Sequence, residues 1–385
     1  MRICIIGAGA VGCATALFLM RLGGCDLQVQ LVERDPSYVR ASSALSASSI
    51  RQQFSNAINV QMSQFGLQWA KAFDVGFVES GYLFLAGEAG AGTLRANHAV
   101  QQSLHAPVVL LEPAELAQRL PWMNTDGVAL ASLGLRGEGW FDGYAFTQAL
   151  KREALRLGAV SVRGEVSALR RAGGRITGAM LADGEQVEAD VFVNAAGPWA
   201  REVAALAGIE LPVFARRRTV FKLTCPTKLA TATPGAGTTP LVIDTSGVWF
   251  RSEGDGFLAG WSPGEHDADP DDQPLDPELT LFEERLWPAL AARVPAFEAL
   301  RVQSAWAGYY EVHPLDHNAI LGPHPEVENL LFANGFSGHG LQHAPAAGRG
   351  LAEWILEGGY QTLDLSPFGF DRVLQARPFR ERAII

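Results

Sequence analysis

The segment that most constrains the fold is RICIIGAGAVGCATALFLMRLGG, at residues 2–24, because it reads as a strand, a tight turn and a helix. Its start is a short apolar run, typical of a strand that is buried on both faces. A GxGxxG pattern follows, formed by Gly7, Gly9 and Gly12, with Ala10 and Val11 before the last glycine. The helical pattern continues to Leu22, and a second apolar run leads to Glu33.

These positions predict a site for the phosphates of a dinucleotide. Gly7 permits the turn, Gly9 lets the backbone approach a pyrophosphate, and Gly12 lets helix and strand pack closely. The free N–H groups and the dipole at the helix start bind the phosphates. Glu33 follows Gly12 by 21 residues, where an acid accepts hydrogen bonds from a ribose. The alternative is a glycine-rich turn without a ligand, as found in many α/β proteins.

Composition and charge limit the classes of partner and compartment. The net charge of the 385 residues is −10, which argues against nucleic acid or an anionic membrane as the main partner. The four cysteines contain no CxxC pair, which favours a reducing, cytoplasmic compartment. The uncharged run from Ile3 to Met20 has the length of a signal peptide or a marginal membrane span. Glycines interrupt it, so we expect no transmembrane segment.

The chain after Glu33 does not continue with further strand–helix–strand units, as a nicotinamide enzyme would. An amphipathic helix is expected at residues 57–73, and residues 162–197 read as a β-meander. The meander has turn signals at residues 173–174 and 183–184 and ends in a buried strand at residues 191–195. This order favours FAD over NAD.

Four segments in order carry a family resemblance: IIGAGAVGCATA with LVERD, SSIRQQFS, VNAAGPWA and NGFSGHGLQHAP. The chain resembles the D-amino-acid oxidase superfamily of FAD enzymes, which includes glycine oxidase, sarcosine oxidase and dimethylglycine dehydrogenase. The resemblance covers nearly the whole length. It implies an α/β (α+β) fold, with a Rossmann-like FAD-binding domain at residues 1–76, 142–212 and 315–385. A mainly antiparallel-sheet substrate domain would comprise residues 77–141 and 213–314.

The resemblance also implies which residues hold the cofactor. The first three glycines and Glu33 would bind the ADP half of FAD. Further contacts along the cofactor would come from Arg34, Ser42, Ser43, Val166, Ala196, Gly197 and Trp199. The late loop would cradle the flavin ring and ribityl chain through Gly335, Ser337, Gly338, His339, Gly340, Leu341 and Gln342. Pro345 would then lie in the first turn of the following helix, where no N–H is missed.

FAD is expected to bind noncovalently. Some members of the superfamily attach the flavin through a cysteine, and the matching position is Gly308. Others use a histidine shortly after the first serines, but SSALSASS contains none. The histidines of the second half of the chain and the calcium-loop-like segment DADPDDQPLDPE do not predict a metal site. That segment is expected to be a solvated acidic loop.

The substrate side of the flavin would be formed by Arg51, Tyr310, His339 and Gln342. An arginine fork can hold a carboxylate, although a structural salt bridge is the alternative for Arg51. Alternation along a strand would turn Tyr309 into the core. A hairpin is expected at residues 248–261, with its turn at residues 255–256. The sequence leaves open which of four arginines face the site, namely Arg216, Arg217, Arg218 and Arg251.

The expected reaction is oxidation of the C–N bond of a small amino acid or N-substituted amino acid that carries a carboxylate. Hydride would pass to the flavin, and the imine would then hydrolyse. One alternative is a 2-hydroxy-acid dehydrogenase, with His313 or His339 as base. Another is a flavoprotein assembly factor with little catalysis. Oxygen-reactive members resembling sarcosine oxidase carry a lysine where this chain has Gln342, which favours a quinone or an electron-acceptor protein over oxygen.

Overall fold

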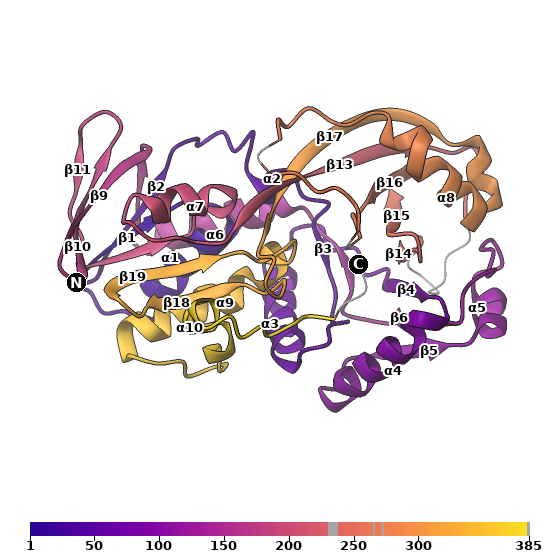
Figure 1. Ribbon diagram of the computed structural model, residues 1–385, viewed down its shortest axis with the longest axis horizontal. Helices are drawn as coiled ribbons and strands as arrows, with labels where there is room; N and C mark the ends of the chain where they lie inside the picture. The colour runs from indigo at the N-terminus through magenta and orange to yellow at the C-terminus, as the bar shows by residue number, and fades with distance from the viewer. Residues whose placement is uncertain (230–237, 265, 272, 383–385) are drawn as a thin grey trace.

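The computed structural model describes residues 1–229, 238–264, 266–271 and 273–382, and two large sheets organise them (Figure 1). The first has six strands in the order β18-β19-β12-β1-β2-β8. Its strands are β1 (Arg2–Ile6), β2 (Gln28–Glu33), β8 (Val160–Arg163), β12 (Val191–Asn194), β18 (Ile320–His324) and β19 (Val327–Asn334). All its pairings are parallel except that of β18 with β19, as in a Rossmann-like sheet.

Apolar layers cover both faces of this sheet. On one face four helices share a core with β1, β2 and β19: α1 (Ala10–Leu22), α3 (Ala57–Ala72), α6 (Gly143–Arg156) and α9 (Gly340–Glu357). On the other face lie a small sheet and a helix: β9 (Val166–Ala172), β10 (Arg175–Leu181), β11 (Gln186–Val187) and α7 (Ala200–Ala205). The helices expected at residues 11–22 and 57–73 and the meander are confirmed to within one residue, because their apolar residues repeat at the periods of helix and strand.

The second sheet has eight strands in the order β17-β13-β16-β15-β14-β4-β6-β5 and lies at the other end of the molecule (Figure 1). It is antiparallel except between β4 and β14. The strands are β4 (Tyr82–Ala86), β5 (Val108–Leu111), β6 (Leu130–Gly134), β13 (Phe214–Thr224), β14 (Leu241–Ile243), β15 (Val248–Glu253), β16 (Gly256–Trp261) and β17 (Arg301–Val312). The fold class is therefore the expected one, whereas the domain boundaries stay a prediction.

Shorter elements connect the two sheets and complete the fold. Further helices are α4 (Glu88–Ser103), α5 (Pro113–Arg119), a π-helical turn η2 (Phe282–Leu286), α8 (Trp287–Arg293) and η3 (Pro295–Ala299). A two-stranded ribbon pairs β3 (Ser49–Ile50) with β7 (Gly139–Trp140). The remaining elements are α2 (Ser42–Leu45), η1 (Gly197–Trp199), η4 (Ser366–Phe368) and α10 (Asp371–Leu374).

Two local predictions were wrong in position: the turn of a hairpin and the place of a proline in a helix. Glu253 pairs with Gly256, so the hairpin turn is Gly254-Asp255, one residue earlier than expected. Gly254 has a φ of +57°, the left-handed conformation that such a turn requires. Pro345 lies inside α9, which begins at Gly340, and therefore falls in the second turn and not the first.

The acidic segment was expected to be solvated, but it lies along the arginines of β13. Arg218 binds both carboxylate oxygens of Asp269, at 2.6 and 2.8 Å. Arg217 pairs with Glu278 at 2.8 Å. These pairs neutralise much of the arginine run, and Asp272 within the segment lies outside the described residues. No cluster of metal-ligating side chains occurs in the part of the chain that the structure describes.

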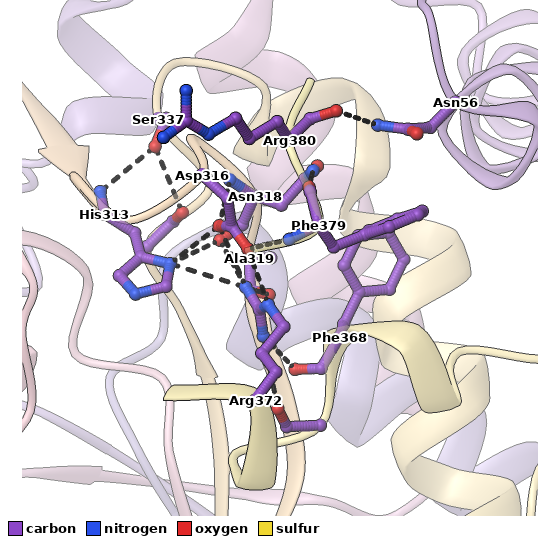
Figure 2. A network of polar contacts seen from close by, with 12 residues as sticks. Asn56, His313, Asp316, Asn318, Ala319, Ser337, Phe368, Arg372, Phe379 and Arg380 are labelled. Atoms are coloured by element: carbon purple, nitrogen blue, oxygen red, sulfur yellow. Dashed lines mark hydrogen bonds and ion pairs between the residues drawn. The ribbon is translucent and has the colours of Figure 1, made fainter. Parts of the chain in front are cut away.

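A buried polar network ties the C-terminal segment to the loop between β17 and β18 (Figure 2). Asp316 Oδ2 lies 2.8 Å from Arg372 Nε and accepts a hydrogen bond from the Phe379 N–H at 2.8 Å. Nδ1 of His313 is 2.9 Å from the Asn318 carbonyl oxygen and 3.1 Å from Asp316. Burial raises the pKa of Asp316, but hydrogen bonds from His313 and Arg372 outweigh it and hold that pKa well below its usual range. His313 is therefore fixed in the fold.

Asp316→Asn should destabilise the protein by about 3–5 kcal/mol at neutral pH, because it leaves the buried Arg372 without its charge partner. The folded-state pKa of Asp316 is depressed, so its contribution is complete above the unfolded pKa of about 3.9 and is lost as the pH falls below that value. Urea unfolding of the wild type and variant at pH 7 and at decreasing pH measures both effects. The exposed Asp371→Asn is the matched control. Equal losses in both variants would contradict the assignment.

Candidate cofactor and substrate site

A cavity of about 570 Å³ borders residues from both sheets. Its wall includes the first glycine turn, α2, η1, β13, β17 and the start of α9. Segments that are far apart in the sequence therefore meet at one elongated space, which extends from the carboxyl ends of β1 and β2 to the Gly338 loop. The carboxyl edge of a parallel sheet is where α/β folds bind their ligands.

Backbone contacts explain two of the three early glycines. A Cβ on Gly7, whose φ is +103°, would lie 2.3 Å from the Ala195 carbonyl oxygen. A Cβ on Gly12 would lie 2.0 Å from the Gly7 carbonyl oxygen. A Cβ on Gly9 would have only the Ser43 Oγ nearby, at 4.0 Å, and Gly9 borders the cavity. No described side chain caps α1 at Gly9, so its first N–H groups remain available to an anion.

Glu33 shapes the mouth of this turn. Its carboxylate accepts hydrogen bonds from the N–H of Ala8 and of Asp35, both at 2.9 Å, and also borders the cavity. Arg34 stacks its guanidinium 3.7 Å above the ring of Trp199. Most of the other predicted cofactor residues line the same cavity, namely Ala10, Val11, Ser42, Ser43, Val166, Ala196 and Gly197.

The donors along this wall fit an FAD molecule. The Ser42 Oγ is buried and has no hydrogen-bond partner among the described residues, as expected for a hydroxyl that serves a phosphate. It lies with Ser43 in α2, beside the uncapped start of α1. The cavity thus offers hydrogen-bond donors in the middle and a carboxylate at one end. Residues 7–43 and 164–199 would hold the adenosine and pyrophosphate.

The glycines of the late loop leave room for side chains of the protein itself, and some of them also border the cavity. A Cβ on Gly338, whose φ is +93°, would lie 2.5 Å from the Tyr310 ring. Gly338, Gly340 and Leu341 border the cavity, whereas Gly335 and Ser337 do not. Ser337 instead accepts a hydrogen bond from the His313 N–H at 3.1 Å, which connects the loop to the network of Figure 2. Tyr310 borders the cavity as expected.

Arg51 is buried without a charge partner. Its side chain is 2% exposed, and it forms no ion pair among the described residues. Nη2 donates to His339 Nε2 at 3.0 Å, the guanidinium carbon lies 4.6 Å from the centre of the Phe54 ring, and Nε has no partner. The salt bridge that was the alternative explanation for Arg51 is absent from the described residues.

The neighbours of Arg51 are neutral. Burial, followed by the Arg51 charge, lowers the pKa of His339 well below its usual value, so this imidazole is uncharged at neutral pH. The side-chain amide oxygen of Gln342 accepts hydrogen bonds from the Arg51 N–H and the Ser63 Oγ, both at 2.9 Å. Arg51, His339 and Gln342 are not among the side chains that line the cavity, whereas Tyr310 is.

Among the cavity residues, Tyr309 and Glu311 were not predicted, and Arg218 is one of the four arginines that the sequence left open. Tyr309 was expected in the core, but it borders the cavity, packs edge-on against Trp199 and donates to the Gln273 carbonyl at 2.6 Å. Arg218 borders the cavity beside Tyr310 while paired to Asp269. Glu311 follows Tyr310 and also lines the wall. Its signal in the sequence was an acid inside an otherwise apolar and aromatic strand.

Two other candidate side chains point elsewhere. Arg251 is buried, pairs with Glu253 and donates to the Ala47 carbonyl at 3.1 Å, so it neither faces the cavity nor lies on a solvated strand face. His313, a candidate base for a 2-hydroxy acid, faces Asp316 and not the cavity.

Comparison with known proteins agrees with this geometry. Residues 2–354 match the family model described as FAD dependent oxidoreductase. The chain therefore belongs to the FAD dependent oxidoreductase family, and its cofactor is FAD. It is 42% identical to FAD-dependent oxidoreductase domain-containing protein 1 of Xenopus laevis, over 99% of this chain and 84% of that protein.

Other similar proteins carry names that state a substrate. Mitochondrial dimethylglycine dehydrogenase of Homo sapiens is 28% identical over 94% of this chain, which spans only 43% of that protein. The structure of L-proline dehydrogenase from P. horikoshii superimposes with a TM-score of 0.84 at 27% identity, covering 97% and 98% of the two chains. Glycine oxidase from Geobacillus kaustophilus, at 22% identity and a TM-score of 0.78 over 96% and 98%, shares the fold.

The helix survey adds one further result. Among the described residues, none of the helices is both long and apolar enough to cross a membrane. The uncharged run near the N-terminus is instead divided between β1 and α1, with Gly7 and Gly9 between them.

Glu33→Ala should weaken FAD binding by about 1–3 kcal/mol, because it removes a charged hydrogen-bond acceptor together with the support of the Ala8 N–H. Flavin fluorescence titration of the apoprotein measures the dissociation constant. Glu188→Ala is the matched control, since Glu188 is an exposed acid that pairs with Arg2 outside the cavity. An unchanged dissociation constant in Glu33→Ala would show that Glu33 does not hold the cofactor.

Proposed function

We propose that the protein oxidises the C–N bond of a small amino acid or N-substituted amino acid, with FAD as the hydride acceptor. The observation that carries this proposal is the buried Arg51, which has no carboxylate partner among the described residues. A buried unpaired cation is costly, and an anionic substrate would compensate it. The guanidinium fork suits a carboxylate.

The acid in this network, Glu138, forms no ion pair with Arg51 among the described residues and is occupied by other donors. Glu138 is fully buried and accepts hydrogen bonds from the Gln52 N–H at 2.6 Å and from Gln53 Nε2 at 2.8 Å. Burial raises the pKa of Glu138 to about 7, although Arg51 and these hydrogen bonds oppose the rise. Glu138 and the RQQ segment therefore hold the Arg51 backbone in place, and the Arg51 charge is left for a ligand.

Tyr310 borders the cavity and feels the charge of Arg51. Burial raises the pKa of its phenol, which therefore stays protonated at neutral pH, and the Arg51 and Arg218 charges act on it. Bound FAD supplies hydride acceptance at this place. Tyr310 would position the substrate beside the flavin, and Arg51 would orient its carboxylate. The enclosed, largely apolar wall would favour the neutral amine that must react.

The relatives support this substrate class through their names alone. Glycine, proline and dimethylglycine each join a carboxylate to an amine nitrogen through one carbon. The L-proline dehydrogenase is 27% identical and the human dimethylglycine dehydrogenase 28% identical over most of this chain. A 2-hydroxy acid would lack both of its expected bases, since His313 is fixed in the Asp316 network and His339 does not line the cavity and accepts a hydrogen bond from Arg51 through Nε2.

Arg51→Lys should weaken binding of the substrate by about 10–100-fold, the equivalent of a lost charge-assisted hydrogen bond of about 1.5–3 kcal/mol. The measurement mixes the FAD-loaded protein anaerobically with amino acids, N-methyl amino acids and 2-hydroxy acids and follows bleaching of the flavin band. Arg293→Lys is the matched control, because Arg293 is a buried arginine paired with Asp244. Bleaching by 2-hydroxy acids alone, or equal effects of both variants, would overturn the proposal.

We also infer that FAD is bound noncovalently. Gly308 borders the cavity at the position where a cysteine would attach the flavin, and it has no side chain to do so. Acid precipitation of the purified protein should leave all the flavin in the supernatant with the mass of free FAD. Yellow colour that remains with the polypeptide would contradict this inference.

The electrons should leave to a quinone or an electron-acceptor protein more readily than to oxygen. Reduction of oxygen creates negative charge, which a nearby ammonium stabilises and a neutral amide does not. Gln342 is neutral, and so is His339. Reoxidation of the substrate-reduced protein in air-saturated buffer should therefore be slow, and a soluble quinone should accelerate it. Reoxidation by oxygen as fast as by quinone would disprove the preference.

A further inference from the structure

Glu311 lines the cavity with a carboxylate that has one unsatisfied oxygen. It lies in β17 beside Tyr310 and is one of the residues that line the cavity. Its Oε2 is buried and has no hydrogen-bond partner among the described residues. Its Oε1 lies 3.5 Å from the position of a Cβ on Gly340, the first residue of α9. The carboxylate is therefore at the N-terminal end of an 18-residue helix.

The charged groups around Glu311 are all committed to other partners. From β13, Arg216 and Arg218 point to Asp269. From the loops beside it, His339 receives a hydrogen bond from Arg51, and His313 faces Asp316. Tyr310, its neighbour in β17, has a raised pKa and stays neutral. Among the described residues, Glu311 has no ion pair.

This environment makes the charged form of Glu311 unfavourable. Burial raises the pKa of Glu311 to about 7, and the backbone N–H groups of Gly335 and Phe336 only oppose that rise. The carboxyl group therefore lies near the midpoint between its charged and neutral forms at neutral pH. A small change of charge nearby would decide which form is present.

The start of α9 is also where negative charge on the cofactor is best stabilised, because the helix dipole and free N–H groups favour an anion there. A second negative charge at the same place would repel the first. We propose that Glu311 is the proton-binding group of the cavity, which takes up one proton when two electrons enter the bound cofactor and releases it when they leave. This inference goes beyond the proposed substrate and needs only that FAD occupies the cavity.

The step balances in atoms and charge. The hydride brings two electrons and one proton to the cofactor, which would gain one negative charge, and a second proton, taken from the solvent, forms an O–H bond on the Glu311 carboxylate. When the acceptor removes the electrons, that O–H bond breaks and the proton returns to water. Glu311 thus keeps the charge of the site nearly constant through the cycle.

Glu311→Gln tests the proposal without any substrate. The FAD-loaded proteins are reduced enzymatically with a reference dye, and the midpoint potential is measured from pH 6 to pH 8.5. Above pH 7, the wild type should bind one more proton per two electrons than the variant, which appears as a steeper fall of potential with pH. Glu188→Gln is the control, the same substitution at an exposed glutamate outside the cavity wall. Its slope should equal that of the wild type.

Equal slopes in the wild type and Glu311→Gln would overturn the proposal. Because the reduction is chemical, this failure is independent of whether an amino acid is the substrate. If Glu311→Gln does not retain FAD, the apoproteins decide. The folded-state pKa of Glu311 is raised, so the wild type loses stability as the pH rises from the usual glutamate pKa of about 4.3 towards 7. The stability of Glu311→Gln relative to wild type should increase over that range, and a constant difference would also overturn the proposal.

Discussion

The close contact between the Gly7 turn and the end of β12 is the constraint on which the rest of the structure depends. The Gly7 carbonyl touches the backbone of Gly12, and Gly7 itself touches Ala195, so that any side chain there would separate strand from helix. This contact fixes the start of α1 at the carboxyl edge of the six-stranded sheet. The cavity forms beside it because β2 and β12 also end there, and Glu33, Ala196 and Gly197 follow those ends.

The other half of the cavity depends on polar contacts and not on backbone packing. The backbone N–H of Arg51 donates a hydrogen bond to Gln342, and the N–H of the next residue, Gln52, donates to Glu138. The Gly338 loop is held by Tyr310 on one side and by Ser337 with His313 on the other. The shape of the cavity near Gly7 therefore depends on steric contacts of the backbone. The shape near the Gly338 loop depends on a chain of buried hydrogen bonds.

This difference explains what the sequence could predict. The strands, helices and glycine turn of the cofactor half are local patterns, and the residues from Gly7 to Trp199 that were expected to hold the cofactor border the cavity, except Gly12, which packs against the Gly7 carbonyl. The partners of long polar side chains are not local. Nothing in the residues near Arg218 indicated that Asp269 would hold it, and strand alternation could not show that Tyr309 borders the cavity at the end of β17.

Chain order places a further demand on how this protein forms. One of the two pairing partners of β1, strand β12, lies about 190 residues along the chain, and β12 in turn pairs with β19 at residues 327–334. Helix α9, which packs on α1, comes later still. During synthesis the part of the α1 surface that α9 covers therefore remains exposed until nearly the whole polypeptide has left the ribosome. Folding dominated by such distant contacts is slow and exposes sticky intermediates, so the nascent chain is a natural client for chaperones.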